Sequence, residues 1–180
     1  MTGSGIEITA DLVRGLVREQ HPDLAGPAAR EVVGGWDNCF LQSVAPSDMA
    51  DAVRAVWDDA VAAPAWTGPP VRVHGDLYPA NAVVSDGTLS GVIDFGDMFA
   101  RDPAWDLAAA WVLLPAGAAA RFFDVYARAD EATIRRARGL AALKCLFLTV
   151  MGRNGDRGLP DGKPTWGPAG RAALERVVHA

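Results

Sequence analysis

The stretch His74-Gly75-Asp76-Leu77-Tyr78-Pro79-Ala80-Asn81, followed by Ile93-Asp94-Phe95-Gly96, decides how this 180-residue chain folds and which chemistry it can carry. Both segments follow short apolar runs that are typical of β-strands. Asp-Gly at residues 86–87, between the apolar runs 82–84 and 89–93, predicts a hairpin that joins the two segments. Carboxylate and amide oxygens at Asp76, Asn81 and Asp94 would then lie in one region of the fold.

The expected hairpin gives a geometric reason for these side chains to meet. If residues 86–87 form a two-residue turn, the ladder places Asn81 opposite Val92, and Asp94 shares the face of Val92. Diagonal neighbours across a ladder lie about 7–8 Å apart, close enough for two oxygen-bearing side chains to reach one cation. A four-residue loop keeps this parity, whereas a three-residue loop breaks it.

The order of the polar residues is that of a metal-assisted phosphoryl-transfer site. Kinase-type sites use a His-x-Asp-x-x-x-x-Asn loop followed by an Asp-Phe-Gly segment. In that pattern Asp76 receives the proton of the substrate hydroxyl, while Asn81 and Asp94 hold Mg²⁺. Each motif alone would more often be a structural turn, but their combination favours a kinase-type site. His74 is expected to support the loop through buried hydrogen bonds.

Composition and charge limit the class of protein. The chain is 50% hydrophobic and 22% charged, as globular proteins are, and its net charge of −5 argues against a nucleic-acid partner. Its two cysteines, Cys39 and Cys145, support neither a disulfide framework nor a zinc site. The first ten residues lack the pattern of a signal peptide, and charged residues interrupt the apolar segments, so we expect no membrane span and a cytoplasmic location.

Helices are expected to dominate the chain on both sides of the hairpin. Apolar spacing predicts a first helix that ends at His21-Pro22, and residues 31–33 read as a short strand. A short strand over residues 71–73 should deliver the His74 loop. Further helices are predicted over residues 47–62, 106–114, 118–129, 131–151 and 169–178, with a long loop over residues 152–168.

At these motifs the chain resembles the aminoglycoside phosphotransferase and choline kinase-like family. Members carry a His-Gly-Asp-Leu-x-x-x-Asn loop and an Ile-Asp-Phe-x-Asp segment, here residues 74–81 and 93–97. The likeness extends to Asp102-Pro103-Ala104-Trp105-Asp106-Leu107-Ala108. It implies that Asp106 braces the catalytic loop by hydrogen bonding, with helix capping as the equal alternative, and that Asp97 is a further candidate near the metal.

The resemblance implies an α+β, mainly α fold: the carboxyl-terminal catalytic lobe of a protein kinase-like fold, with a short active-site hairpin. Family members move the γ-phosphate of ATP or GTP, with Mg²⁺, to a hydroxyl of a small molecule. An aminoglycoside-like acceptor is polycationic, and three carboxylates could form an acidic rim for it. A solvated surface is the favoured interpretation of these three residues. These carboxylates belong to Asp156, Asp161 and Glu175.

One part of the family pattern is missing from the sequence. Members have an amino-terminal lobe whose lysine grips the nucleotide, but the lysines of this chain, Lys144 and Lys163, both follow Asp94. We therefore interpret residues 1–40 as a remnant of that lobe and residues 41–180 as the catalytic lobe. The alternative function is a catalytically impaired fragment or regulatory binding module. An apolar lobe interface left exposed predicts self-association or a partner chain that covers it.

Overall fold

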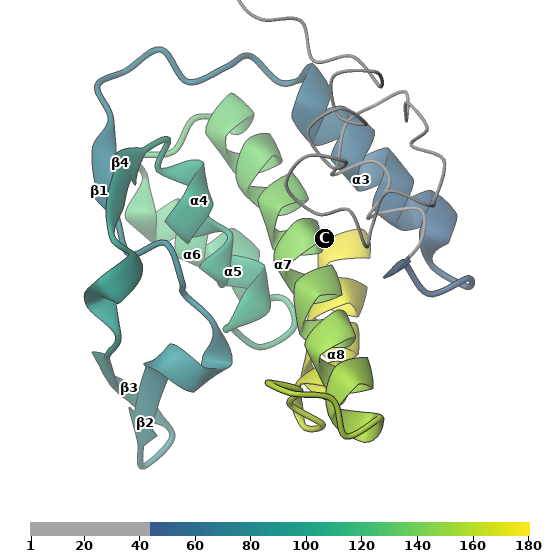
Figure 1. The fold of residues 1–180 in the computed structure, drawn as a ribbon. Coiled ribbons are helices and arrows are strands. Elements are labelled where there is room, and N and C mark those ends of the chain that lie inside the picture. The colour runs from purple at the N-terminus through teal and green to yellow at the C-terminus, as the bar shows by residue number, and fades with distance from the viewer. Residues whose placement is uncertain (1–43) are drawn as a thin grey trace, which may run out of the picture. The chain divides into compact units, whose positions relative to one another are not determined.

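The structure, a computed structural model, describes residues 44–180 and is an α+β arrangement that is mainly helical, as expected (Figure 1). The strands lie together on one side of the helices. The helix expected before His21, the strand expected over residues 31–33 and the proposed remnant over residues 1–40 lie outside the described residues. The helices are α3 (Ala50–Ala62), α4 (Ala104–Leu107), α5 (Ala109–Val112), α6 (Ala118–Tyr126), α7 (Glu131–Asp156) and α8 (Trp166–Val178).

Two nested antiparallel ladders bring the sequence motifs together. The outer ladder pairs β1 (Val71–Val73) with β4 (Phe99–Arg101), and the inner ladder pairs β2 (Ala82–Ser85) with β3 (Thr88–Val92). The His74–Asn81 loop connects β1 to β2, and residues 93–98 connect β3 to β4. Because both ends of each connection are paired with the ends of the other, the two motif segments must face one another.

The hairpin forms around Asp86-Gly87, but its expected register is wrong. Val84 pairs with Leu89, whereas Val83 pairs with Gly91, so Ser90 is an extra residue in β3. Such a β-bulge shifts the pairing by one position. Asn81 therefore lies opposite Ile93, whose N–H donates to its carbonyl oxygen at 3.0 Å, and not opposite Val92. The alternation argument for a shared face of Asn81 and Asp94 fails for this reason.

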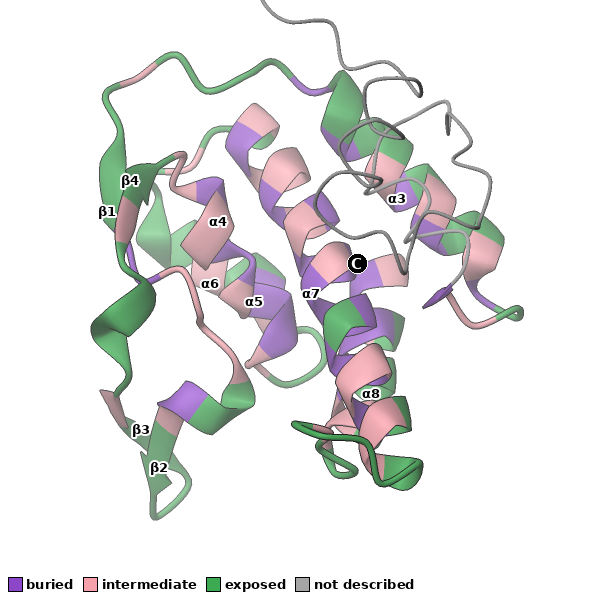
Figure 2. Cartoon of the chain, in the orientation of Figure 1, coloured by how far each residue is buried: buried purple, intermediate pink, exposed green. Residues whose placement is uncertain are grey.

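The core lies between α7 and the helices packed against it. Helix α7 contacts α3, α4, α5 and α8, and its small and apolar side chains facing them are almost fully buried (Figure 2). Asp130 caps the start of α7 by accepting the Thr133 N–H at 2.8 Å. Arg135 of α7 forms an ion pair with the exposed Asp59 of α3. No helix among the described residues is long and apolar enough to cross a membrane.

Several helix boundaries differ from the sequence prediction. The helix expected over residues 106–114 begins earlier and is divided into α4 and α5, while α7 continues to Asp156 and α8 begins already at Trp166. The connection between α7 and α8 is therefore shorter than predicted. It folds back on α7, where the Lys163 N–H donates to the Met151 carbonyl oxygen at 2.8 Å. Periodicity alone did not reveal this, because glycines that weaken a helix pattern here permit close backbone packing.

Gly152 tests the packing of α7 against α8. A Cβ at Gly152 would collide with the backbone of Gly167, where two main chains meet. We expect Gly152→Ala to lower the free energy of unfolding by about 1–3 kcal/mol, despite alanine's better helix propensity, because backbone cannot move aside. Gly91→Ala is the control, since its Cβ would meet only the Val83 Cβ at an ordinary 3.9 Å. Equal urea midpoints for the two variants would contradict this packing argument.

Cys145 of α7 gives the fold a specific sensitivity to alkaline pH. Burial raises the pKa of its thiol from 9.0 to about 12, with Arg176 opposing the shift. Above pH 9 the unfolded chain loses this proton while the folded chain keeps it, so stability falls by up to about 1.4 kcal/mol per pH unit. Cys145→Ala lacks this loss. We expect it to be less stable than wild type at pH 7, and the difference to narrow from pH 9 to 11 in urea titrations; parallel curves would refute the assignment.

Candidate active site

Asp76 and Asn81, both in the loop of residues 74–81, are in direct contact. The Asn81 side-chain amide donates to the carbonyl oxygen of Asp76 at 2.8 Å and to its carboxylate Oδ2 at 2.9 Å. Asn81 is buried, whereas Asp76 is partly exposed. The amide thus fixes one carboxylate oxygen and leaves the other, Oδ1, without a donor among the described residues. A carboxylate held in this way can accept a proton from a bound hydroxyl.

His74 joins the loop of residues 74–81 to the Asp-Phe-Gly segment. Its ring is buried, its Nε2 lies 2.8 Å from the Ile93 carbonyl oxygen, and its ring centroid lies 4.7 Å from that of Phe95. Its Nδ1 accepts the Asp76 N–H at 3.3 Å, so Nε2 is the protonated nitrogen that donates to Ile93. His74 therefore contacts the residues on both sides of Asp94, in the supporting position expected for it.

The carboxylate of Asp106 holds the loop of residues 74–81. Oδ2 accepts the His74 N–H at 2.6 Å, and Oδ1 accepts the Gly75 N–H at 3.1 Å. Of the two roles open at the sequence level, bracing of the loop is therefore the one observed. The alternative, capping of the helix, falls to Asp102, whose Oδ1 accepts the Ala104 N–H at 2.9 Å where α4 begins.

Gly75 occupies a position that no other type of residue would fit. Its φ is +88°, and a Cβ there would lie 2.6 Å from the Asp97 carbonyl oxygen and 2.8 Å from the Phe99 ring. Glycine alone adopts this conformation without strain. The close approach brings residues 97–99 against the loop, so the missing side chain lets the two motif segments lie side by side.

Three side chains that support the loop were not predicted. Trp105 Nε1 and Lys144 Nζ donate to the Gly75 carbonyl oxygen at 2.8 and 3.1 Å. Tyr78 stacks on Trp166 at a ring-centroid distance of 6.2 Å and contacts Phe147. Burial raises the pKa of the Tyr78 hydroxyl, and the Asp76 carboxylate raises it further. The one available sequence signal was the charge of Lys144 inside the apolar run 140–151.

Comparison with known proteins identifies a family for this chain. The model of the APH family, described as a phosphotransferase enzyme family, matches residues 6–140. The chain belongs to this family. No curated protein and no solved structure matches the chain significantly. The family match places the chain in a phosphotransferase enzyme family. The roles of the loop, the Asp-Phe-Gly segment and Asp106 in a reaction stay predictions, as does the assignment of residues 41–180 as a kinase-type lobe.

Phosphotransferases of this family generally use ATP and a metal ion, and Asn81 and Asp94 each offer an oxygen of the kind that a hard cation prefers. The Asn81 amide uses its nitrogen toward Asp76, so its Oδ1 accepts no hydrogen bond from the described residues and is not sealed from solvent. Asp94 has an exposed carboxylate without an ion pair in the described part of the chain, and its φ of +62° ends the strand pattern. Asp97 is also exposed. Residues 44–180 contain no cluster of three His, Cys, Asp or Glu side chains that could form a complete cage.

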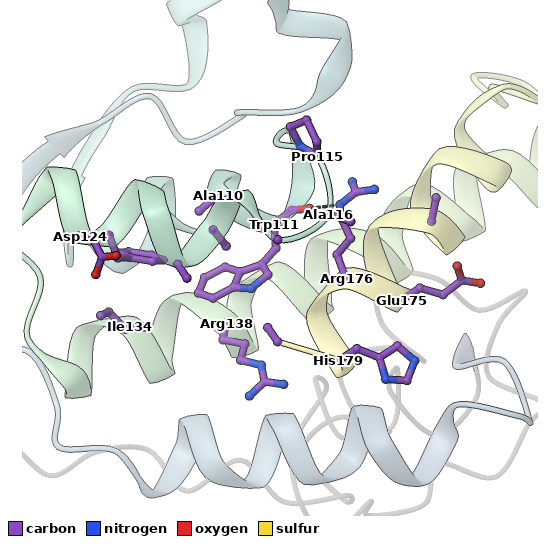
Figure 3. A pocket seen from close by; sticks show the side chains of 16 residues that line it. Ala110, Trp111, Pro115, Ala116, Asp124, Ile134, Arg138, Glu175, Arg176 and His179 are labelled. Atoms are coloured by element: carbon purple, nitrogen blue, oxygen red, sulfur yellow. Dashed lines mark hydrogen bonds between the residues drawn. The ribbon is translucent and has the colours of Figure 1, made fainter.

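A cavity of about 790 Å³ lies away from these motifs, between α5, α6, α7 and α8 (Figure 3). No lining residue belongs to the loop 74–81 or to residues 93–98. The indole N–H of Trp111, a lining residue, is buried without a partner among the described residues. Arg138 and Arg176 already donate to backbone carbonyl groups. We therefore place the candidate chemistry at the motifs.

The structure does not gather the candidate acidic rim. Asp156 ends α7 and Asp161 lies in the following connection, whereas Glu175 is near the far end of α8, where it lines the cavity. Glu175 also lies 3.4 Å from Arg171 in an ion pair. These three carboxylates do not form one surface for a polycationic acceptor.

Asp106 provides the first test of the site. Asp106→Ala leaves the N–H groups of His74 and Gly75 without their acceptor, and we expect it to lower the free energy of unfolding by about 2–4 kcal/mol. Hydrogen exchange should accelerate most at these two amides. Asp124→Ala is the control, because Asp124 is exposed on α6 and forms no ion pair among the described residues. An unchanged exchange rate at Gly75 would disprove the bracing role.

Proposed function

We propose that the chain is a small-molecule phosphotransferase that moves the γ-phosphate of ATP or GTP to an alcohol group, with Mg²⁺ as the metal. The observation that carries this proposal is the Asp76 carboxylate, held at 2.9 Å by Asn81 in a loop that contacts both neighbours of Asp94 through His74. This pattern combines one proton acceptor with two oxygen donors. Family membership supports the same class of reaction.

In the proposed reaction Asp76 is the general base. Its free Oδ1 accepts the proton of the acceptor hydroxyl while the hydroxyl oxygen forms a bond to the γ-phosphorus. The bond between the γ-phosphorus and the departing nucleoside diphosphate breaks at the same time. Asn81 and Asp94 would hold Mg²⁺, with Asp97 as a further candidate; the bound ion would neutralise phosphate charge. His74 and Asp106 act on the loop rather than on the substrates.

The acceptor is proposed as a small hydroxylated molecule. The separation of Asp156 and Asp161 from Glu175 removes the acidic rim as an argument for a polycationic antibiotic. Aromatic side chains lie near Asp76 instead, since Tyr78 is stacked with Trp166. Acceptor screening should therefore include neutral alcohols as well as aminoglycosides.

Asp76→Asn is the decisive variant. Asparagine keeps the shape of the side chain and an oxygen that can accept from Asn81, but it cannot take a proton at neutral pH. We expect kcat for nucleotide-dependent phosphorylation of an acceptor to fall by about 100- to 10,000-fold, with the melting temperature nearly unchanged. Asp124→Asn, exposed on α6, serves as the matched control. Equal transfer rates for wild type and Asp76→Asn, followed by ³¹P NMR with Mg²⁺, would eliminate the proposal.

A non-catalytic binding module is the second candidate. The observation in its favour is that no lysine precedes Lys144, so the chain lacks the lysine that clamps the nucleotide in the family pattern. A lost charge-assisted hydrogen bond weakens binding by about one to two decades. Calorimetry separates the candidates: tight Mg²⁺·ATP binding by the full chain counts against the impaired module. Self-association, or a partner chain that covers an apolar surface, stays a prediction. Exposed apolar side chains belong to Val84, Leu89, Phe95 and Met98.

A further inference from the structure

Lys144 is a buried cation that the proposed reaction does not use. It lies in the middle of α7 with only 6% of its surface exposed. No carboxylate stands within ion-pair distance of its ammonium group in the described part of the chain. Burying a lysine without such a partner is unfavourable, so its contacts must compensate for the lost hydration.

The contacts of Lys144 all lie at the catalytic loop and its support. Its Nζ donates to the Gly75 carbonyl oxygen at 3.1 Å. It also stands 4.7 Å from the ring centroid of Tyr78 and 5.5 Å from that of Trp105, within the range of cation–π attraction. Burial lowers the pKa of Lys144, while the carboxylates of Asp106 and Asp76 act to raise it. The charge of Lys144 is thus directed at the loop that carries the proposed base.

The group that Lys144 holds is the peptide that leads into Asp76. The carbonyl oxygen of Gly75 accepts from both Lys144 and Trp105, and the N–H of the same peptide, which belongs to Asp76, donates to His74 Nδ1. A peptide is planar, so donors on one side and an acceptor on the other fix its rotation. Gly75, with a φ of +88°, would otherwise allow this plane to turn.

We propose that Lys144 is a positioning residue for Asp76: by holding the Gly75 carbonyl oxygen it sets the plane of the Gly75–Asp76 peptide and hence the direction of the Asp76 carboxylate. The kinetic part of this inference rests on the proposed phosphotransferase function. The structural part does not, because it concerns a hydrogen bond and an orientation that can be observed without turnover. A misplaced base lowers kcat, whereas the binding of nucleotide and acceptor is left to other groups.

The test uses Lys144→Met, which keeps a long apolar side chain and removes the charge and the donor. The matched control is Lys163→Met, at the other lysine of the chain, which is exposed. In ¹⁵N/¹³C-labelled full-length protein we expect the Gly75 carbonyl carbon and the Asp76 amide to change chemical shift in Lys144→Met and to stay unchanged in the control. In the transfer assay we expect kcat to fall about 10- to 100-fold, with both KM values within about twofold.

Trp105→Phe supplies a second variant, since it removes the other donor to the same oxygen. Because the two donors share one acceptor, we expect their effects on kcat to be non-additive in a double-mutant cycle. If Lys144→Met fails to fold, Lys144→Gln takes its place, with a neutral donor on a shorter stem. We expect the kcat of Lys144→Gln to lie between that of the wild type and that predicted for Lys144→Met.

The outcomes separate this inference from the proposed function. A shifted Gly75 carbonyl signal in a chain without transferase activity keeps the positioning contact and rejects the function. Active Lys144→Met protein with wild-type kcat, or with unmoved Gly75 and Asp76 signals, overturns the positioning role. A rise in KM at constant kcat also overturns it, because that pattern belongs to a binding residue.

Discussion

The carboxylate of Asp106 is the constraint on which the site depends. It accepts the N–H groups of His74 and Gly75 at 2.6 and 3.1 Å, in the part of the loop that precedes a short 3₁₀ helix over Pro79–Asn81. Asp106 itself sits on the short helix α4, and Asp102, just before this helix, forms an ion pair with Arg136 of α7 at 2.7 Å. The position of the loop can thus be traced, bond by bond, to the helical core.

The two nested ladders hold the same loop at its ends. The loop is fixed at one end by β1–β4 and at the other by β2–β3, and Gly75 admits the backbone of Asp97 against it. On these supports the two motif segments carry one oxygen of Asp76, the Oδ1 of Asn81 and the exposed carboxylates of Asp94 and Asp97. A loop held at both ends suits a site in which charge is to be stabilised without rearrangement.

Much of this site could be predicted from sequence because its parts are local. Residues 74–81 and 93–96 form recognisable motifs, Asp-Gly marks the hairpin, and the alternatives for Asp106 included the one observed. The register could not be predicted, since the bulge at Ser90 depends on contacts across the strands. Nor could β4, a three-residue strand that exists only because β1 lies beside it, nor the role of Lys144, which helical periodicity shows as a lone charge in an apolar run.

The supports of the loop come from widely separated parts of the chain. The side chains and carbonyl group that hold His74 and Gly75 lie 19 to 69 residues away along the chain. They belong to Ile93, Trp105, Asp106 and Lys144. Contacts of such high sequence separation close late, after local helices and hairpins have formed. During synthesis the motif segments would leave the ribosome well before α7 does. We therefore expect the geometry of the loop to form late in folding, only when the middle of α7 docks, and incomplete folding to become visible first in this region.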